Sequence, residues 1–367
     1  MQPDFDLFVK KAKPVTVEEY QPTHTFATFG LDPLLVNTLR GRGYETPTPI
    51  QDQAIPHLLD ERDVIGIANT GTGKTAAFLL PLLHHTLANM QKSTLILAPT
   101  RELAMQIQDE LRLLAKNTNI RSTLVVGGMP VGRQIANLKR RQQFVVGTTG
   151  RTLDLANRKF IDLGAFDTLV LDEMDQMLDM GFLPDIQKIL RASSANKHLL
   201  FFSATMDKRI EKIAREMLQD PVHVSVKTGV TTDNVEQDVV RHQAGEDKLD
   251  ILHNLLLEHN PEKAIVFDNM KHAVKNLERK LQNLGHKAVS IHGNKSQGQR
   301  KRALEDFKKG RANILIATNV AARGLDIPNV SHVYNFSLPQ SREDYIHRIG
   351  RTGRAGSTGH AFTFVPE

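Results

Sequence analysis

The sequence predicts an α/β fold of two consecutive domains, each a mostly parallel sheet with helices on both faces. Short apolar runs closed by Gly, Pro or polar residues alternate with helical patterns along most of the 367 residues. This alternation stops at a polar, turn-rich stretch, 220–236, and then starts again. Near-continuous apolar strands separated by helices are typical of a parallel sheet buried on both faces. The length also exceeds that of the commonest single-domain proteins.

The apolar runs place the strands and the domain boundaries. We expect a first domain at 25–226, a linker at 227–235 and a second domain at 236–367. Residues 1–24 mix Lys, Pro, Glu and Thr without periodicity, which indicates a flexible extension, so we expect a bare two-domain core with a short N-terminal tail. Besides one at the start of 65–83, the expected strands lie in 93–99, 122–128, 144–149, 168–173, 198–205, 263–269, 287–293, 312–319, 330–336 and 360–366.

The composition narrows the class of protein. Hydrophobic residues make up 40% and charged residues 24%, as in globular proteins that dissolve in water. No apolar run is long enough for a membrane-spanning helix, and the N-terminus lacks the apolar core of a signal peptide. The absence of cysteine excludes disulfides and thiolate chemistry and fits a reducing compartment, so we expect a cytoplasmic location. A net charge of +6 favours a polyanionic partner.

A Gly-rich turn between an apolar strand and a helix, within 65–83, predicts a phosphate-binding loop. It fits the pattern G-x-x-x-x-G-K-[ST], with Ala at the first position. Glycines let backbone N–H groups surround phosphate oxygens, the Lys reaches the β- and γ-phosphates, and the Thr hydroxyl ligates Mg²⁺. The alternative is a chance Gly-rich turn, which the Lys–Thr pair disfavours. The predicted loop comprises Ala68, Asn69, Thr70, Gly71, Thr72, Gly73, Lys74 and Thr75.

Two adjacent carboxylates, Asp172 and Glu173, follow the apolar run that begins at 168. At the end of a strand, one carboxylate can hold Mg²⁺ while the other activates an attacking water. Taken alone, the pair would rather indicate an acidic helix N-terminus. Together with the phosphate-binding loop it favours an ATP site in which Lys74, Asp172 and Glu173 are catalytic.

From Phe26 to about Val365, these residues and the motifs below resemble, in order, the DEAD-box family of ATP-dependent RNA helicases, with D-E-M-D at 172–175. The resemblance implies two tandem RecA-like domains and ATP with Mg²⁺ as cofactors. It also implies RNA as the partner, single-stranded or a short duplex, held through its backbone. We further expect a monomeric core.

The stretch at 43–51 resembles the motif that reads adenine in the family, with Tyr44 where Phe is usual. Gln51 suits this task because one amide both donates to and accepts from the edge of the base. Phe26 matches the upstream aromatic residue that stacks on the base. The alternative for Phe26 is ordinary packing in the core.

Motifs that hold RNA in the family are matched in both domains. Hydroxyls, close-approach glycines and arginines bind a backbone without reading its sequence. An alternative for the first arginine, Arg101, is a salt bridge with Glu102 or another neighbour. The matching residues are Thr100, Arg101, Gly128, Thr148, Gly150 and Arg151 in the first domain and Gly293, Gln297, Arg300 and Thr318 in the second.

The stretch 203–205 resembles the motif that links the ATP state to strand separation, and 317–326 resembles a motif that contacts both RNA and ATP. Ser203 and Thr205 are expected to hydrogen-bond Asp175, and Asp326 to contact the ATP ribose.

The stretch 345–354 supplies the last match. His347 resembles the residue that bridges to the first-domain carboxylates, and Arg351 and Arg354 resemble paired arginine fingers, which make hydrolysis depend on domain closure. The alternative is a basic helix that faces solvent.

Four positions depart from the family pattern. Met174 replaces Ala, Thr149 replaces Pro, and Asn319 replaces Asp, while Asn69 occupies a variable position. Neither Thr149 nor Asn319 deletes a group that performs the chemistry. The changes at Thr149 and Asn319 raise the prospect of weaker coupling between RNA and ATP hydrolysis.

The leading functional hypothesis is an RNA-dependent ATPase that locally unwinds short RNA duplexes when ATP and RNA close the two domains. One alternative is an ATP-gated RNA clamp or scaffold with weak hydrolysis, which the departures at Met174 and Asn319 motivate. Another is a DNA-directed helicase of the same superfamily, against which the adenine-reading motif argues.

Overall fold

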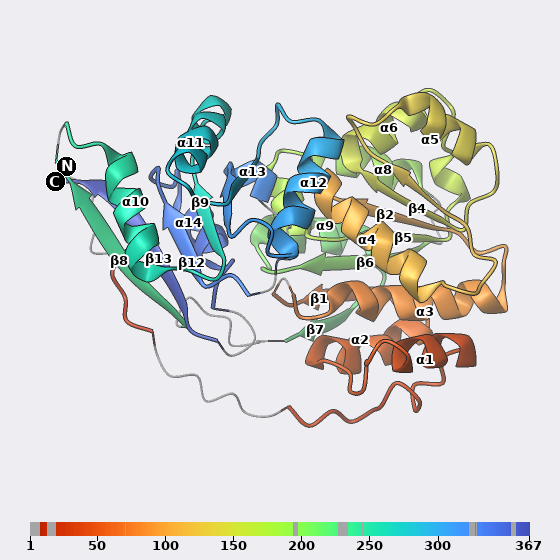
Figure 1. Ribbon diagram of the computed structural model, residues 1–367. Coiled ribbons are helices and arrows are strands. Elements are labelled where there is room, and N and C mark those ends of the chain that lie inside the picture. Colours follow the sequence, from red (N-terminus) through yellow and green to blue (C-terminus); the bar gives the residue numbers. More distant parts are fainter. Residues whose placement is uncertain are drawn as a thin grey trace. The chain divides into compact units, whose positions relative to one another are not determined.

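The computed structural model describes residues 8–12, 20–69, 71–193, 197–226, 234–243, 245–322, 327, 329–353 and 357–367, without the side chains at 320, 322 and 343 (Figure 1). The chain divides into two compact units. The first is Glu19–Thr228, and the second is Gly229–Glu367 together with the N-terminal residues 8–12. Of the expected linker, 227–235, the structure describes only 234 and 235. The division therefore differs from the expected one chiefly at the N-terminus.

The first unit is built on a parallel sheet whose strands fall on the predicted apolar runs. The strands are β1 (Val64–Ile67), β2 (Thr94–Ala98), β3 (Ser122–Val125), β4 (Phe144–Thr148), β5 (Thr168–Leu171), β6 (His198–Ser203) and β7 (Val222–Ser225). Among the described residues their order is β3-β4-β2-β5-β6-β1-β7. In the register, Val64 of β1 lies opposite Leu200 of β6 and Val222 of β7. Most strand residues are buried, as the near-continuous apolar runs predict.

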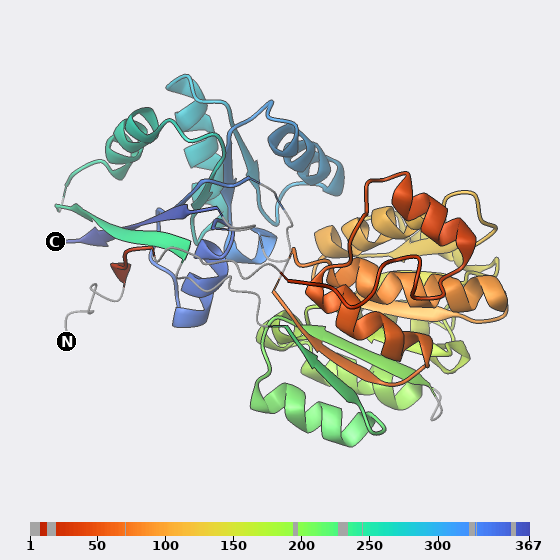
Figure 2. The same ribbon diagram turned by 90° about the horizontal axis from the view of Figure 1, so that it is seen from below.

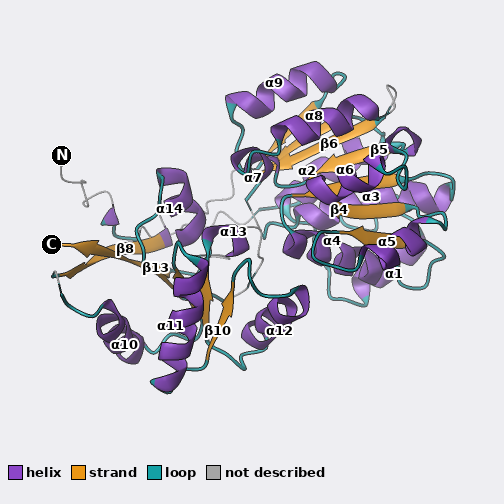
Figure 3. Cartoon of the chain, turned by 90° about the horizontal axis from the view of Figure 1, so that it is seen from above, coloured by secondary structure: helices purple, strands orange, loops and turns teal. Residues whose placement is uncertain are grey.

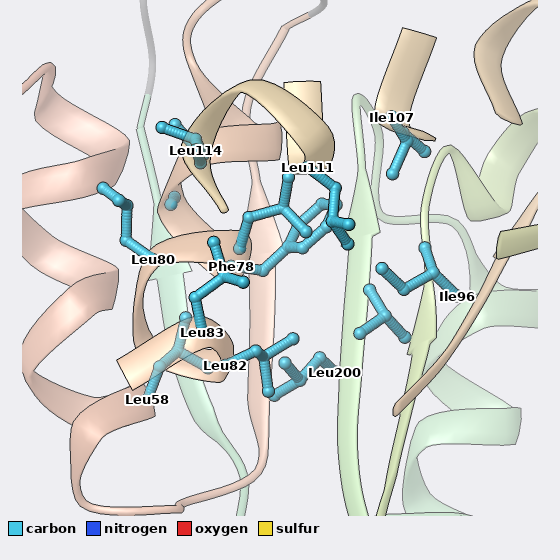
Figure 4. Close-up of a cluster of buried hydrophobic side chains, with 14 of the residues drawn as sticks. Leu58, Phe78, Leu80, Leu82, Leu83, Ile96, Ile107, Leu111, Leu114 and Leu200 are labelled. Atoms are coloured by element: carbon cyan, nitrogen blue, oxygen red, sulfur yellow. The ribbon is translucent and has the colours of Figure 1, made fainter. Parts of the chain in front are cut away.

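Helices cover both faces of this sheet. They are α1 (Pro33–Arg40), α2 (Pro49–Leu59), α3 (Lys74–Ala88), α4 (Arg101–Leu114), α5 (Val131–Leu138), α6 (Thr149–Asn157), α7 (Met174–Asp179), α8 (Leu183–Ala192) and α9 (Lys208–Met217). Because strand side chains alternate between faces, Phe202 joins an apolar cluster with α1 to α4, and Phe201 joins another with α5 to α9. In Figure 2, α1 to α3, red to orange, lie on one side of the sheet and α9, green, on the other. Figure 4 shows part of the first cluster, with Phe78 of α3, Leu111 of α4 and Leu200 of β6 among its labelled residues.

The second unit repeats this plan (Figure 3). Its strands are β8 (Val235–His242), β9 (Ala264–Phe267), β10 (Ala288–Ile291), β11 (Ile314–Ala317), β12 (His332–Asn335) and β13 (Gly359–Pro366), and its helices are α10 (Lys248–His259), α11 (Lys271–Asn283), α12 (Gln297–Lys308), α13 (Asn319–Ala322) and α14 (Arg342–Ile349). The described strands pair in parallel in the order β10-β11-β9-β12-β13-β8. One apolar cluster joins the sheet to α12 and α14, and another joins it to α10 and α11. Across the described parts of both units, no helix combines the length and apolar character that crossing a membrane requires.

The described N-terminal residues make specific contacts, unlike the flexible extension that the sequence suggests. Lys10 and Gln237 of β8 form an antiparallel bridge. Further along, the carboxylate of Asp52 accepts hydrogen bonds from the Tyr20 hydroxyl (2.5 Å) and the backbone N–H groups of Thr23 (2.9 Å) and His24 (3.0 Å). Burial alone would raise the pKa of the Asp52 carboxyl, but these hydrogen bonds outweigh it and lower the pKa.

Candidate active site and RNA interface

The predicted phosphate-binding loop connects β1 to α3. Gly71 and Gly73 adopt φ angles of 85° and 93°, a backbone conformation in which a side chain is strained. A Cβ on Gly73 would also lie 2.5 Å from Nε2 of Gln51. The glycines therefore allow both the turn and the close approach of helix α2. Thr70 lies outside the described residues.

The lysine side chain of the loop is held by a hydrogen bond to the backbone of the same loop. Lys74 is the first residue of α3, is 6% exposed, and donates from Nζ to the carbonyl oxygen of Ala68 (2.6 Å). The Thr72 hydroxyl donates to the carbonyl oxygen of Asn69 (2.7 Å). Thr75 follows in the first turn of α3, so its position relative to Lys74 is set by the helix. This end of α3 offers the N–H groups and the positive charge that phosphates require.

Gln51 connects the adenine-reading motif to the phosphate-binding loop. Its Nε2 donates to the carbonyl oxygen of Gly73 (3.2 Å), and its Oε1 accepts from the N–H of Thr48 (2.9 Å). Phe26 is 4% exposed, and its ring lies 6.1 Å from that of Phe29 and 6.2 Å from that of Tyr44. Contact of Gln51, Phe26 or Tyr44 with a nucleotide stays a prediction, and Phe26 lies here in the core packing that was its alternative.

The acidic pair stands at the same edge of the sheet as the phosphate-binding loop. Asp172 follows the last residue of β5, which pairs with β6, and β6 pairs with β1. Asp172 and Glu173 are each 2% exposed. Glu173 has a φ of 53°, a left-handed conformation that costs a residue with a side chain about 1–2 kcal/mol. Strained backbone of this kind persists only where the surrounding structure enforces it, and it is commonest at active sites.

The electrostatics of Asp172 fit a cation site. Burial raises the pKa of its carboxyl, the nearby Lys74 charge and the N–H of Glu173 oppose the rise, and the pKa settles at about 6. A divalent cation beside the carboxylate would lower that pKa again. Hydroxyl and carboxylate oxygens suit Mg²⁺, so Thr75 and Asp172 fit the metal that the sequence predicts. Among the described residues no cluster of three or more His, Asp or Glu that could chelate a metal is present.

Asp175 is tied to the loop that follows β6. Its Oδ2 accepts from the N–H groups of Ala204 and Thr205 and from the Thr205 hydroxyl, each at 3.1 Å. Its own N–H donates to Oγ of Ser203 (3.2 Å). The hydrogen bonds expected from the sequence are present. They join helix α7, which begins right after Glu173, to the 203–205 motif.

Two of the expected RNA-binding motifs of the first unit lie together. Thr100 caps α4 by accepting from the N–H of Leu103 (3.2 Å). The guanidinium of Arg101 lies against the backbone of Gly127 and Gly128, so a Cβ on Gly128 would meet its Nη1 at 2.1 Å. Gly128 also has a φ of 74°. A glycine is thus required beside this arginine.

The third expected motif spans the end of β4 and the first turn of α6, with Thr148, Gly150 and Arg151. Arg151 Nε lies 3.5 Å from Oδ2 of Asp154. Its Nη1 is buried and makes no hydrogen bond among the described residues. A buried donor without an acceptor is costly, so a bound phosphate oxygen would satisfy this nitrogen.

In the second unit, expected RNA-binding residues follow two neighbouring strands. Gly293 and Gln297 come after β10, and Thr318 comes after β11, which pairs with β10 in parallel. A Cβ on Gly293 would approach Cε of Lys271 to 3.0 Å. Gln297, Arg300 and Thr318 are 9%, 8% and 7% exposed. Ligands of open parallel sheets bind at this carboxyl edge, so the placement supports the predicted interface.

Helix α14 carries His347 and ends two residues before Arg351, and both residues belong to the predicted stretch 345–354. Arg351 is 5% exposed, and its Nε donates to the carbonyl oxygen of His347 (3.2 Å). The exposed basic helix that was the alternative is therefore wrong for Arg351. Arg354 and Asp326 lie outside the described residues.

A hollow of about 650 Å³ opens at the opposite edge of the first sheet, beside Asp63, Thr168 and His198 at the starts of β1, β5 and β6. Its charged groups pair with one another, as Glu61 does with Lys92. Because the hollow lies at the starts of the strands and the predicted nucleotide site follows their ends, the two are separate.

Comparisons with known proteins agree with this geometry. The family described as DEAD/DEAH box helicase matches residues 48–213, and the helicase conserved C-terminal domain matches 247–356. The DEAD-box ATP-dependent RNA helicase CshA of Bacillus subtilis is 46% identical over 347 residues, which are 94% of this chain and 70% of that relative. The chain belongs to the DEAD-box helicase family.

Other similar proteins support this membership. The ATP-dependent RNA helicase CshA of Listeria monocytogenes is 47% identical over 346 residues. That match covers 93% of this chain but only 66% of the relative, so the chain spans just under two thirds of its length. Among solved structures, S. cerevisiae Dbp5 bound to RNA and ADP BeF3 is 34% identical, with a TM-score of 0.82 and coverage of 94% of this chain and 90% of that chain. The prediction of two tandem RecA-like domains, each a mostly parallel sheet with helices on both faces, is confirmed.

The structure accounts for two departures from the DEAD-box pattern in the first domain. Met174 is fully buried in the apolar cluster beneath α7, so it fills space in the core. Thr149 is also fully buried, and its hydroxyl lies 3.6 Å from Sδ of Met177. It thereby connects the first turn of α6 to α7.

The third departure belongs to a network that the sequence reasoning missed. The guanidinium of Arg348, 1% exposed, donates to Oδ1 of Asn319 (2.7 Å) and of Asn269 (2.7 Å) and to the carbonyl oxygen of Ser337 (2.6 Å). Asn319 in turn donates from Nδ2 to Oδ2 of Asp344 (3.1 Å). A signal was available, because Arg348 shares the apolar face of α14 with Tyr345 and Ile349.

Proposed function

We propose that this DEAD-box protein is an RNA-dependent ATPase that locally unwinds short RNA duplexes. The observation that carries the proposal is the convergence of Lys74, Asp172 and Glu173 at one edge of the first sheet, with Asp175 bonded to the 203–205 motif. The relatives are named ATP-dependent RNA helicases, and the solved Dbp5 complex contains RNA and ADP BeF3.

In this proposal the first domain holds the nucleotide and its metal. Lys74 binds the β- and γ-phosphates, while Thr75 and Asp172 hold Mg²⁺. The bound ion would offset the negative charge that develops on the phosphates. Glu173 acts as the general base that takes a proton from the attacking water, which its place beside Asp172 supports.

The second domain would supply the remaining charge stabilisation. Arg351 and Arg354 act as arginine fingers, His347 bridges to the carboxylates, and Asp326 contacts the ribose. Hydrolysis would therefore require ATP and RNA to close the two domains. Closure would bend one RNA strand so that its partner is released, and hydrolysis would reopen the domains.

The protein would bind RNA without recognising its base sequence. The proposed contacts come from hydroxyls, arginines and backbone next to glycines, and such groups bind phosphates and sugars. Target choice would then come from segments or partners beyond this core. A monomeric state and a cytoplasmic location remain part of the proposal.

An ATP-gated RNA clamp with weak hydrolysis is the second candidate, favoured by Asn319 in the network around Arg348. ATP hydrolysis measured while RNA or DNA of the same sequence is titrated separates the candidates. The proposal expects RNA to raise turnover at least about tenfold, given the gain that arginine fingers provide, and DNA to have little effect. Tight RNA binding without stimulated turnover would support the clamp, and equal stimulation by DNA would contradict RNA specificity.

A further inference from the structure

Residues 8–12 pack on the second domain, although that domain begins only after the whole first domain in the sequence (Figures 2 and 3). The ring of Phe8 meets the ring of Tyr345 edge to face, with centroids 4.7 Å apart and planes inclined by 62°. Phe8 thereby joins the apolar cluster that also contains Ile349 of α14. Aromatic pairs with this geometry are favourable beyond the area that they bury.

The backbone of the same segment binds the edge strand of the sheet. The N–H of Lys10 donates to the carbonyl oxygen of Gln237 (2.9 Å), and the N–H of Gln237 donates to the carbonyl oxygen of Lys10 (2.8 Å). β8 is the last strand in the described sheet order, so these bonds use groups that an edge strand leaves open. We call residues 8–12 the N-terminal clasp.

The two contacts of the clasp meet at one buried hydrogen bond. The Tyr345 hydroxyl and Oε1 of Gln237 lie 2.9 Å apart, and both residues are 5% exposed. Burial raises the pKa of Tyr345, which keeps its hydroxyl protonated as the donor. The clasp, β8 and α14 are thus joined in a closed set of contacts: Phe8 to Tyr345, Tyr345 to Gln237, and Gln237 to Lys10.

Two sets of contacts hold the buried face of helix α14. Of its described side chains, Asp344, Tyr345, Arg348 and Ile349 are buried, whereas Ile346 is 42% exposed. Arg348 is held by the asparagine network, and Tyr345 is held by Gln237 and the clasp. The helix also carries His347 and leads directly into Arg351. A small tilt of α14 would therefore move the proposed arginine finger, and a misplacement of about 1 Å can cost on the order of a hundredfold in rate.

We propose that Phe8 and Lys10 are positioning residues for Arg351, and that the clasp holds α14 in the orientation that hydrolysis requires. This inference rests on the proposed function, because the finger role of Arg351 belongs to it. Phe8 and Lys10 contact α14 and β8 of the second domain, whereas Lys74, Thr75 and Asp172, which are proposed to hold the phosphates and Mg²⁺, belong to the first. Loss of the clasp thus lowers kcat and leaves the affinity for ATP unchanged.

Two variants of the full chain test the clasp through different contacts. Phe8→Ala removes the ring from Tyr345, and Lys10→Pro removes the N–H that donates to Gln237. Val9→Ala is the matched control, because Val9 lies between them and is 50% exposed. Phe8→Tyr is a second control, which should behave like the wild type because it keeps a ring against Tyr345.

Two measurements are made on each variant. Amide hydrogen exchange over residues 342–351, without ATP or RNA, reports the stability of α14 directly. Steady-state ATP hydrolysis at saturating RNA gives kcat and KM. We expect Phe8→Ala and Lys10→Pro to speed exchange in α14 and to lower kcat about tenfold with KM for ATP unchanged. Val9→Ala and Phe8→Tyr should match the wild type.

The outcomes separate this inference from the proposed function. If RNA does not stimulate ATP hydrolysis by the wild type, the proposed function is wrong, and the positioning role of the clasp is wrong with it. If the wild type is stimulated but both variants keep its kcat, the inference is wrong, whatever the exchange shows. Unchanged exchange in α14 likewise contradicts it, because the clasp would then not hold the helix.

Discussion

Asp175 and Thr205 share two hydrogen bonds at one carboxylate oxygen, since the N–H and the hydroxyl of Thr205 each lie 3.1 Å from Oδ2 of Asp175. Asp175 sits in the first turn of the helix that follows Glu173, whereas Thr205 follows β6. A change at the carboxylates can therefore reach the 203–205 motif through a single side chain.

Thr205→Val removes the hydroxyl bond and leaves the backbone bonds to Asp175. A hydrogen bond to a charged group contributes about 1.5–3 kcal/mol, so we expect the motif to loosen. The unwinding rate of a short RNA duplex should fall about tenfold, while ATP affinity stays unchanged. Thr205→Ser is the control, because it keeps the hydroxyl. Equal unwinding by the Val variant would show that the hydroxyl bond carries no coupling.

The pKa of Asp172 predicts how stability depends on pH in the absence of nucleotide. The folded-state pKa, about 6, lies above the ordinary value of 3.8. The folded protein therefore binds the proton more tightly than the unfolded chain does, and this contribution to stability declines as pH rises from about 4 to about 6. Ionised Asp172 then costs roughly 1–3 kcal/mol at pH 7.5.

Asp172→Asn should remove this cost. We expect the nucleotide-free variant to be more stable than the wild type at pH 7.5, and to lose that advantage at pH 4, as measured by urea unfolding. Mg²⁺ with ATP should stabilise the wild type more than the variant, because the ionised carboxylate is one of the groups that hold the ion. An equal advantage of the variant at both pH values would contradict the assigned pKa.

Gly128→Ala tests whether RNA binding depends on the position of the Arg101 guanidinium. The added Cβ would meet Nη1 of Arg101 at 2.1 Å, and the φ of 74° disfavours a side chain. We expect the displaced guanidinium to weaken RNA binding about tenfold, with ADP binding unchanged, as measured by fluorescence anisotropy. Gly132→Ala is the matched control, because nothing lies within 4 Å of its Cβ. RNA binding lost in both variants would point to a general disturbance of the domain.

Asn319→Asp restores the residue that is usual in the family. The new carboxylate would gain an ion pair with Arg348 but would lie about 3.1 Å from that of Asp344, where Asn319 now donates a hydrogen bond. Because like charges this close oppose ionisation, we expect a loss of stability of about 1 kcal/mol at pH 7.5 that shrinks at acid pH. Adding Asp344→Asn should reverse the loss. A single variant that is more stable than the wild type at pH 7.5 would contradict this account.

The fold was largely predictable because its strands are short apolar runs between polar closures. The Gly-rich turn between β1 and α3 and the place of the acidic pair after β5 were predictable because each is a local pattern of neighbouring residues. In both cases the signal lies within a few positions of the sequence.

The remaining features depend on partners distant in sequence. Arg348 gains its acceptors from Asn269 and Asn319, which no local pattern connects to it. Phe8 and Lys10 lie in a stretch without periodicity, and they contact α14 and β8, which are far away in the sequence. The buried Arg348 in an apolar position of α14 was the one signal that closer attention to periodicity would have found.

Single-turnover hydrolysis of ATP with saturating RNA tests the central claim most directly, with Glu173→Gln compared against the wild type. The account predicts that the variant binds ATP and RNA like the wild type but hydrolyses ATP at least about a hundredfold more slowly, because the general base is lost. Hydrolysis at the wild-type rate in Glu173→Gln would contradict the assignment of Glu173 and the active site built around it.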